Sequence, residues 1–188
     1  MRHMNSHHQL LLGSAAILVG SLAIAGCHNQ PAHPDEKAGV TNSLNTSNLS
    51  DVGVSQDREK GVMTLTGNVA SDDQKTQAEN LAKQAAPDYT IADEIGVRPA
   101  GDSNAGSVAS NLDSAIEDNF KASIKAHNNL DDQSIHCSAK NGTLVLKGTV
   151  KTMEQKREAE SLAKHVPNVQ QVVNELEVKP TKHSTSNS

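Results

Sequence analysis

Residues 61–69 read GVMTLTGNV, and residues 142–150, which lie 81 positions further along the chain, read GTLVLKGTV. The similarity continues through the next 14 residues, so that positions 61–83 and 142–164 share 11 identities in 23. Unrelated sequences of ordinary composition would share about one or two. The chain therefore contains a duplicated unit, and two copies predict two similar small domains rather than a solenoid.

The two copies predict the same order of elements. In residues 61–69 and 142–150 apolar side chains alternate with polar ones, which is the period of a half-buried strand. Ser71 and Thr152 each precede a Gln by three positions, a pattern that predicts the start of a helix. A short apolar strand then closes each copy. The expected buried stripes of the two helices are Ala78, Leu81, Ala82 and Ala85 in copy one, and Ala159, Leu162, Ala163 and Val166 in copy two.

A glycine interrupts the buried face of the second strand in each copy, at Gly67 and Gly148. Glycine inside a strand marks a bulge or a close approach of another backbone. We expect the helix that packs across the sheet to make that approach.

The two copies differ upstream of these strands. In copy two, residues 111–129 place Leu112, Ile116, Phe120 and Ile124 at four-residue intervals, which predicts an amphipathic helix. In copy one the corresponding residues 28–50 are rich in Asn, Ser, Thr and Pro and predict a flexible tether. We therefore predict an α+β fold of two αββαβ modules, each with helices on one face of a three-stranded sheet, in which the first helix of module one is short or missing. Copy two is expected to fold alone and copy one is not.

The expected boundaries follow from these patterns. They are a signal peptide at 1–26, a tether at 27–50, a first module at 51–99, a linker at 100–110, a second module at 111–180 and a disordered tail at 181–188.

The amino terminus has the layout of a secretory signal. Arg2 precedes an apolar run from Leu10 to Ile24, which at 15 residues is shorter than the ~20 that a spanning helix needs. The run ends in Ile24-Ala25-Gly26-Cys27, which resembles the bacterial lipobox, and this resemblance implies acylation of Cys27. His28 follows, and under the sorting rule of two-membraned bacteria a residue other than Asp implies the outer membrane. The alternatives are an ordinary signal peptide or an uncleaved anchor with a cysteine there by chance.

Composition argues against several classes of function. The formal charge of −5 lacks the basic excess that drives nucleic-acid binding, so no nucleic-acid partner is expected. The histidines and the two cysteines show no metal-ligand spacing, and no phosphate loop or nucleophile elbow occurs. His136 and Cys137 adjoin, but strand alternation predicts that Cys137 is a small core residue. We expect no catalytic residue, no metal and no cofactor.

The pattern as a whole resembles the BON domain: a helix, two strands with G-x-V/L-x-L-x-G-x-V in the second, a helix with A-x-x-L-A and a strand ahead of Pro. Duplicated behind a lipobox, it resembles the dual-BON envelope lipoproteins. The resemblance implies a non-enzymatic, lipid-anchored protein that supports the cell envelope under osmotic or membrane stress, with modules that bind phospholipid or bridge the membrane to an envelope partner. The alternative is a periplasmic protein-binding adaptor or scaffold with no lipid recognition beyond its anchor.

The candidate contact surface lies on the helix predicted for copy two. Phe120 stands beside Lys121 and Lys125, and an aromatic flanked by cations suits the headgroup level of a membrane. Phe120 is also in register with Ile116 and Ile124, which favours the core instead. These three residues are the predicted contact with phospholipid or with a partner.

Overall fold

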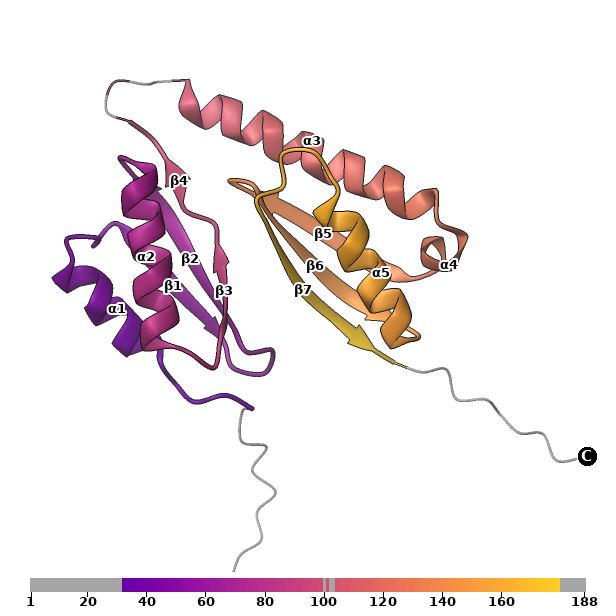
Figure 1. The fold of residues 1–188 in the computed structure, drawn as a ribbon, viewed down its shortest axis with the longest axis horizontal. Helices are drawn as coiled ribbons and strands as arrows, with labels where there is room; N and C mark the ends of the chain where they lie inside the picture. Colours follow the sequence, from indigo (N-terminus) through magenta and orange to yellow (C-terminus); the bar gives the residue numbers. More distant parts are fainter. Residues whose placement is uncertain (1–31, 100, 102–103, 180–188) are drawn as a thin grey trace, which may run out of the picture. The chain divides into compact units, whose positions relative to one another are not determined.

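The structure is a computed structural model, and it describes residues 32–99, 101 and 104–179 (Figure 1). Two modules with the same order of elements follow one another, and we call residues 32–99 module 1 and residues 104–179 module 2. Module 1 contains α1 (Lys37–Thr46), β1 (Val52–Asp57), β2 (Val62–Val69), α2 (Asp72–Ala85), β3 (Thr90–Asp93) and β4 (Gly96–Val97). Module 2 contains α3 (Ala105–Lys125), α4 (Asn128–Asp131), β5 (Ser134–Lys140), β6 (Thr143–Val150), α5 (Met153–Lys164) and β7 (Gln171–Val178). The predicted α+β fold of two tandem modules is confirmed.

The two sheets have the same topology. In module 1, β1 pairs antiparallel with β2, while β3 and β4 both run parallel to β2. In module 2, β5 pairs antiparallel with β6, and β7 runs parallel to β6 without interruption. The third strand of module 1 is broken because the Asp93 carboxylate accepts a hydrogen bond from the backbone N–H of Ile95 at 3.0 Å, which turns the chain between β3 and β4.

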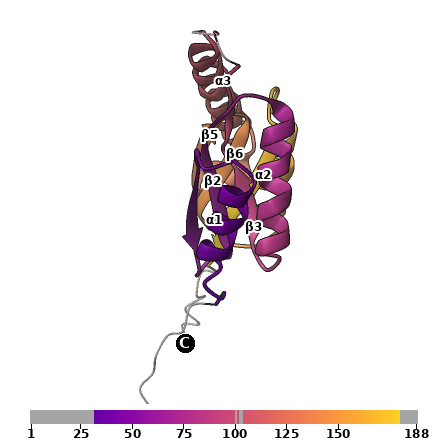
Figure 2. The same cartoon turned by 90° about the vertical axis from the view of Figure 1, so that its left-hand side faces the viewer.

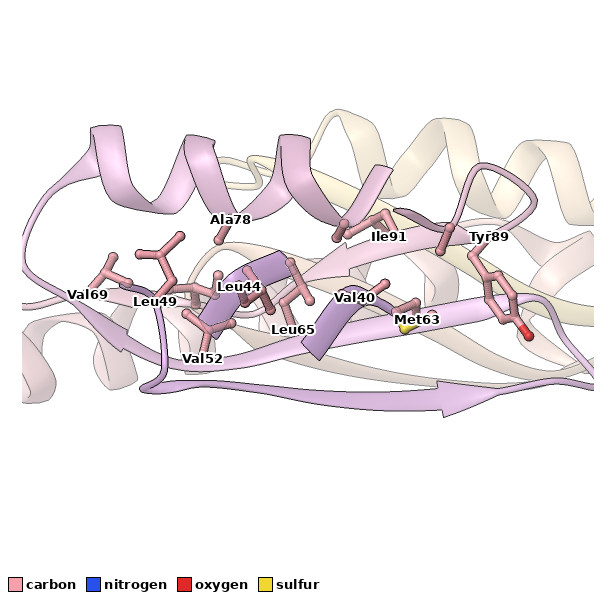
Figure 3. Packing of buried hydrophobic residues seen from close by; sticks show 13 residues of the cluster. Val40, Leu44, Leu49, Val52, Met63, Leu65, Val69, Ala78, Tyr89 and Ile91 are labelled. Atoms are coloured by element: carbon pink, nitrogen blue, oxygen red, sulfur yellow. The ribbon is translucent and has the colours of Figure 1, made fainter. Parts of the chain in front are cut away.

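The core of module 1 lies between its helices and its sheet. Val40 and Leu44 of α1 are 0% and 1% exposed and pack with Met63 and Leu65 of β2 and with Ala78 of α2 (Figure 3). Figure 2 shows α2 running alongside the strands of this module. An equivalent cluster fills module 2 around Ile116, Phe120, Leu144, Leu146 and Leu176.

The predicted tether at 27–50 is wrong over much of its length, because α1 occupies Lys37–Thr46. A helix this rich in Asn, Ser and Thr has weak intrinsic propensity and is stabilised by packing. It contributes only two buried apolar side chains, so its sequence carries almost no periodic signal. The first helix is thus present and short, with 10 residues against 21 in α3, and the reason for expecting copy one not to fold alone is removed.

The predicted linker at 100–110 is also too long, because α3 begins at Ala105. Its first turns bury no residue, and Val108 and Leu112 are 55% and 43% exposed. The apolar stripe that predicted this helix becomes buried only from Ile116 onward, which is why the sequence placed its start too late.

The two strand glycines have positive φ angles, 111° at Gly67 and 121° at Gly148. A Cβ at Gly148 would lie 1.9 Å from the carbonyl oxygen of Ser134, and one at Gly67 would lie 2.3 Å from that of Asp51. The prediction of a close backbone approach is confirmed, but its source was wrong. The approaching carbonyl belongs to the start of the neighbouring strand, where β1 and β5 begin, and not to the helix.

The predicted helix starts are confirmed. Thr152 and Gln155 form a complete capping box at α5. At α2 the Ser71 hydroxyl accepts from the backbone N–H of Gln74, while the Gln74 side chain accepts from the N–H of Ala70 instead of that of Ser71.

Contacts between the modules involve the sheet faces that carry no helix. Val62 and Ala92 of module 1 form a small apolar cluster with Val145 and Val173 of module 2. The Gln171 side chain accepts a hydrogen bond from the N–H of Asp93 at 2.8 Å and donates one to the carbonyl of Ile91 at 2.7 Å. One amide side chain therefore satisfies two backbone groups on the outer edge of β3.

Candidate functional site

The side chains predicted to contact lipid or a partner line a groove in module 2. The groove lies between the carboxyl-terminal half of α3 and the start of β5 and has a volume of about 340 Å³. Phe120, Lys121, Ile124 and Lys125 line it from α3. The remaining lining residues are Asp131, Gln133, Ile135, His136 and Cys137.

The floor of the groove is apolar. Phe120 is 1% exposed and belongs to the core of module 2, so it forms part of the floor and does not project into solvent. Ile124, Ile135 and Cys137 are half-buried and pack against the same core. An acyl chain or another apolar group could be buried here at the edge of the existing core.

The rim of the groove carries both signs of charge. The Lys121 ammonium lies 3.2 Å from the Glu117 carboxylate and 3.9 Å from that of Asp118, and the hydrogen bond from Lys121 to Glu117 raises the pKa of Lys121. Lys125 is exposed and makes no ion pair within the described part of the chain. Asp131, the last residue of α4, adds a carboxylate to the lining. Lys125 is therefore the cation on this rim that is free to meet an anionic group.

Cys137 is unsuited to nucleophilic chemistry in this setting. Burial is the largest influence and raises the pKa of its thiol; Lys121 acts in the opposite direction, and Glu117 and Asp118 raise the pKa by smaller amounts. Reactive cysteines need the opposite shift. Ile135, Cys137 and Ala139 share the inward face of β5, as strand alternation predicted, while His136 is exposed on the other face.

The described residues contain neither a cluster of metal ligands nor a membrane-spanning helix. Within residues 32–99 and 104–179, no group of three or more His, Cys, Asp or Glu side chains is placed to hold a metal ion. None of the helices in these same ranges is long and apolar enough to cross a membrane. Cys27, the predicted acylation site, lies outside the described residues.

A second hollow, of about 330 Å³, lies where the modules meet. Asp72, Lys75 and Asp113 supply its charged groups. The Asp113 carboxylate is already occupied, since it accepts hydrogen bonds from the backbone N–H groups of Asn141 and Gly142 at 2.8 and 3.0 Å. Asp113 thus serves the fold, and the groove between α3 and β5, which contains the predicted contact residues, is the better candidate site.

Sequence reasoning identified the helical wall of this groove and missed the strand wall. Ile135 and Cys137 lie in β5, but nothing in the sequence indicates which helix covers the outer edge of that strand. Glu117 was also missed as a structural residue. Its carboxylate accepts from the backbone N–H of Ala139 at 3.0 Å, and this bond, more than the one from Lys121, lowers the pKa of Glu117.

The family comparison covers both modules. The model of the BON domain matches residues 37–99 and 112–180, which is most of the chain, and the protein therefore belongs to the BON-domain family. The first match begins at α1, in agreement with the corrected boundary of module 1.

A curated protein and a solved structure are also similar to this chain. Osmotically-inducible protein Y of Escherichia coli (strain K12) is 30% identical over 132 residues, which cover 70% of this chain and 65% of that protein. Among solved structures, CdsD, a structural protein of the type III secretion system of Chlamydia trachomatis, is similar with 13% identity and a TM-score of 0.30, over 78% of this chain and 63% of that one. At that TM-score the likeness supports no inference about this protein.

Proposed function

We propose that this protein is a non-enzymatic, lipid-anchored component of the cell envelope, exposed to the periplasm, whose second module binds phospholipid at the groove between α3 and β5. The observation that carries the proposal is the groove itself, in which an apolar floor lies beside the unpaired ammonium of Lys125. A phospholipid has the complementary parts, because its phosphate suits Lys125 and its acyl chain suits the floor. The name of the osmotically inducible relative supports a role in osmotic or membrane stress.

The charge of the groove limits the kind of binding to expect. Lys121 is neutralised by Glu117 and Asp118, and Asp131 opposes Lys125, so a general attraction to anionic membranes is weak. We therefore expect a modest affinity that depends on Lys125 and falls with salt.

Liposome binding of the Cys27→Ser chain without its signal peptide tests the groove apart from the anchor. Vesicles containing phosphatidylglycerol should sediment the protein, and Lys125→Glu should abolish most of that binding. Lys164→Glu is the matched control, because Lys164 is also an exposed helical lysine but lies on α5 away from the groove. Equal binding by the two variants, or no binding by the parent chain, would reject lipid recognition.

The second candidate function is a protein-binding adaptor that contacts lipid only through its anchor. The formal charge of −5 and the presence of both carboxylates and lysines on α3 favour it, since mixed charges suit a protein partner better than an anionic membrane. Failure of the parent chain to bind vesicles, together with capture of one envelope protein that Lys125→Glu releases, would favour this function.

The anchor is tested separately by Cys27→Ser in the full-length precursor. Only a cysteine thiol accepts the diacylglyceryl group, so the variant should not incorporate a labelled fatty acid and should keep its signal segment. Incorporation of label and fractionation with membranes at the mature size would refute the anchor. We assign the outer membrane on the residue after the cysteine, His28, and fractionation of the acylated protein between the two membranes tests it.

A further inference from the structure

The segment that precedes α1 is attached to module 1. Residues 32–36, which we call the arm, lie against the turn between β1 and β2. The backbone N–H of His33 donates to the carbonyl of Arg58 at 3.1 Å, and the Nε of Arg58 donates back to the carbonyl of His33 at 3.0 Å. This reciprocal pair fixes the arm to the turn.

Side chains from one strand and one loop hold the next residue of the arm. The carbonyl of Pro34 accepts hydrogen bonds from the Gln56 side chain, at 2.8 Å, and from the hydroxyl of Tyr89, which is 7% exposed. The Gln56 carbonyl group in turn accepts from the backbone N–H of Lys37 at 3.2 Å, at the start of α1. The arm thus continues into α1 without a free segment.

The imidazole of His33 is packed as well as its backbone. Its ring lies 5.3 Å from the ring of Tyr89, and it covers Gly61, where an added Cβ would come within 2.4 Å of the imidazole. Gly61 therefore provides the space that the arm needs at the end of the turn.

The docked arm leaves a very short connection to the proposed anchor. Five residues separate Cys27 from His33, whereas the tether expected from the sequence had 23. The six Cα–Cα steps from Cys27 to His33 span at most about 20–22 Å when fully extended. The 24 steps from Cys27 to Asp51, where the expected tether ends, would span at most about 80–86 Å.

We infer that the arm presents the β1–β2 end of module 1 to the membrane leaflet that carries the acyl chains. This inference rests on the proposed acylation of Cys27. The opposite end of the module, where β2 ends and α2 begins, lies about 23 Å further along the eight residues of β2 at ~3.3 Å per residue. Arg58 and Lys60 are balanced by Asp57 and Glu59, so the chain connection and not charge holds this end at the lipid surface.

Quenching by lipids that carry a nitroxide on the headgroup tests the orientation. The acylated protein is reconstituted in phosphatidylcholine vesicles with Cys137 replaced by Ala, and a fluorophore is attached to a cysteine at Glu59 or at Asp73. Both positions are exposed, one beside the turn and the other in the first turn of α2. Strong quenching at position 59 and weak quenching at position 73 is the expected result, and equal quenching at the two positions would overturn the inference.

A change of connection length supplies the control. Insertion of 20 Gly/Ser residues between Gln30 and Pro31 should remove most of the quenching at position 59, because the arm stays docked while the segment between Cys27 and the arm becomes longer. The same insertion after Ser184 should leave the quenching unchanged. Persistence of the difference after the first insertion would show that something other than the arm orients the module.

The same samples distinguish this inference from the proposed anchor. Mass spectrometry of the purified protein reports the acyl chains directly. Absence of acylation would overturn both the anchor and the orientation, whereas equal quenching of an acylated protein would overturn the orientation alone.

Discussion

The carboxylate of Glu117 on α3 accepts a hydrogen bond from the backbone N–H of Ala139 on β5 at 3.0 Å. β5 is one of the two outer strands of the module 2 sheet, so its outward N–H groups would otherwise be open to pairing with another chain. Asp113, one helical turn before Glu117, caps the β5–β6 turn in the same way. Two acidic side chains of α3 therefore protect the strand that forms one wall of the candidate groove.

Replacement of Glu117 by Ala should destabilise module 2 by about 1 kcal/mol at neutral pH, because it removes a charged acceptor that is partly exposed. The hydrogen bond lowers the pKa of Glu117, so its contribution is present above the ordinary carboxyl pKa of about 4.3 and is lost as the pH falls through the lowered value. Urea unfolding of both proteins between pH 7 and pH 2.5 should show the difference shrink in acid. Asp118→Ala is the control, since the Asp118 side chain is 82% exposed and accepts no hydrogen bond from a backbone N–H of the described residues. A constant difference across this range would contradict the assignment.

Replacement of Gly148 by Ala should destabilise the protein by about 2–4 kcal/mol, because both the positive φ and the Ser134 carbonyl oppose a Cβ. Gly39→Ala is the matched control. Gly39 lies in α1 with nothing within 4 Å of an added Cβ, so alanine there should stabilise by about 0.5–1 kcal/mol. Thermal unfolding measures both, and a neutral Gly148→Ala would show that β5 moves to accept the methyl group.

Asp93→Asn should raise stability at neutral pH. Burial raises the pKa of Asp93, so the folded protein binds its proton more tightly than the unfolded chain. The asparagine oxygen keeps the acceptor for the N–H of Ile95. Because the pKa is raised, the native protein should gain stability relative to the variant as the pH falls through that raised value toward about 3.9. Denaturant unfolding across this range tests the sign, with Asp88→Asn at an exposed position as the reference.

Gln171→Ala should leave the N–H of Asp93 and the carbonyl of Ile91 without their partner and cost about 1–3 kcal/mol. The amide proton of Asp93 should exchange faster with solvent, which hydrogen exchange followed by NMR measures directly. Gln170→Ala is the neighbouring control, since Gln170 is exposed. Unchanged exchange at Asp93 would mean that Gln171 does not protect the β3 edge in solution.

A fragment of residues 32–99 should fold, and a fragment of residues 51–99 should not. The shorter fragment lacks Val40 and Leu44, and the loss of one such buried side chain costs about 2–5 kcal/mol. Hydrogen exchange of the two fragments separates the outcomes. Strong protection in the shorter fragment would show that α1 is dispensable for the module.

The duplication, the alternating strands and the helix starts at Ser71 and Thr152 could be predicted from the sequence, because they depend on local spacing that each copy repeats. The remaining features depend on tertiary packing. α1 is stabilised because Val40 and Leu44 pack against the sheet and α2. No local pattern distinguishes its ten residues from a tether. The carbonyl that faces Gly148 comes from Ser134, and the strand wall of the groove comes from β5. Contacts between residues far apart in the chain depend on how the elements pack, which the spacing of residues along a single segment does not specify.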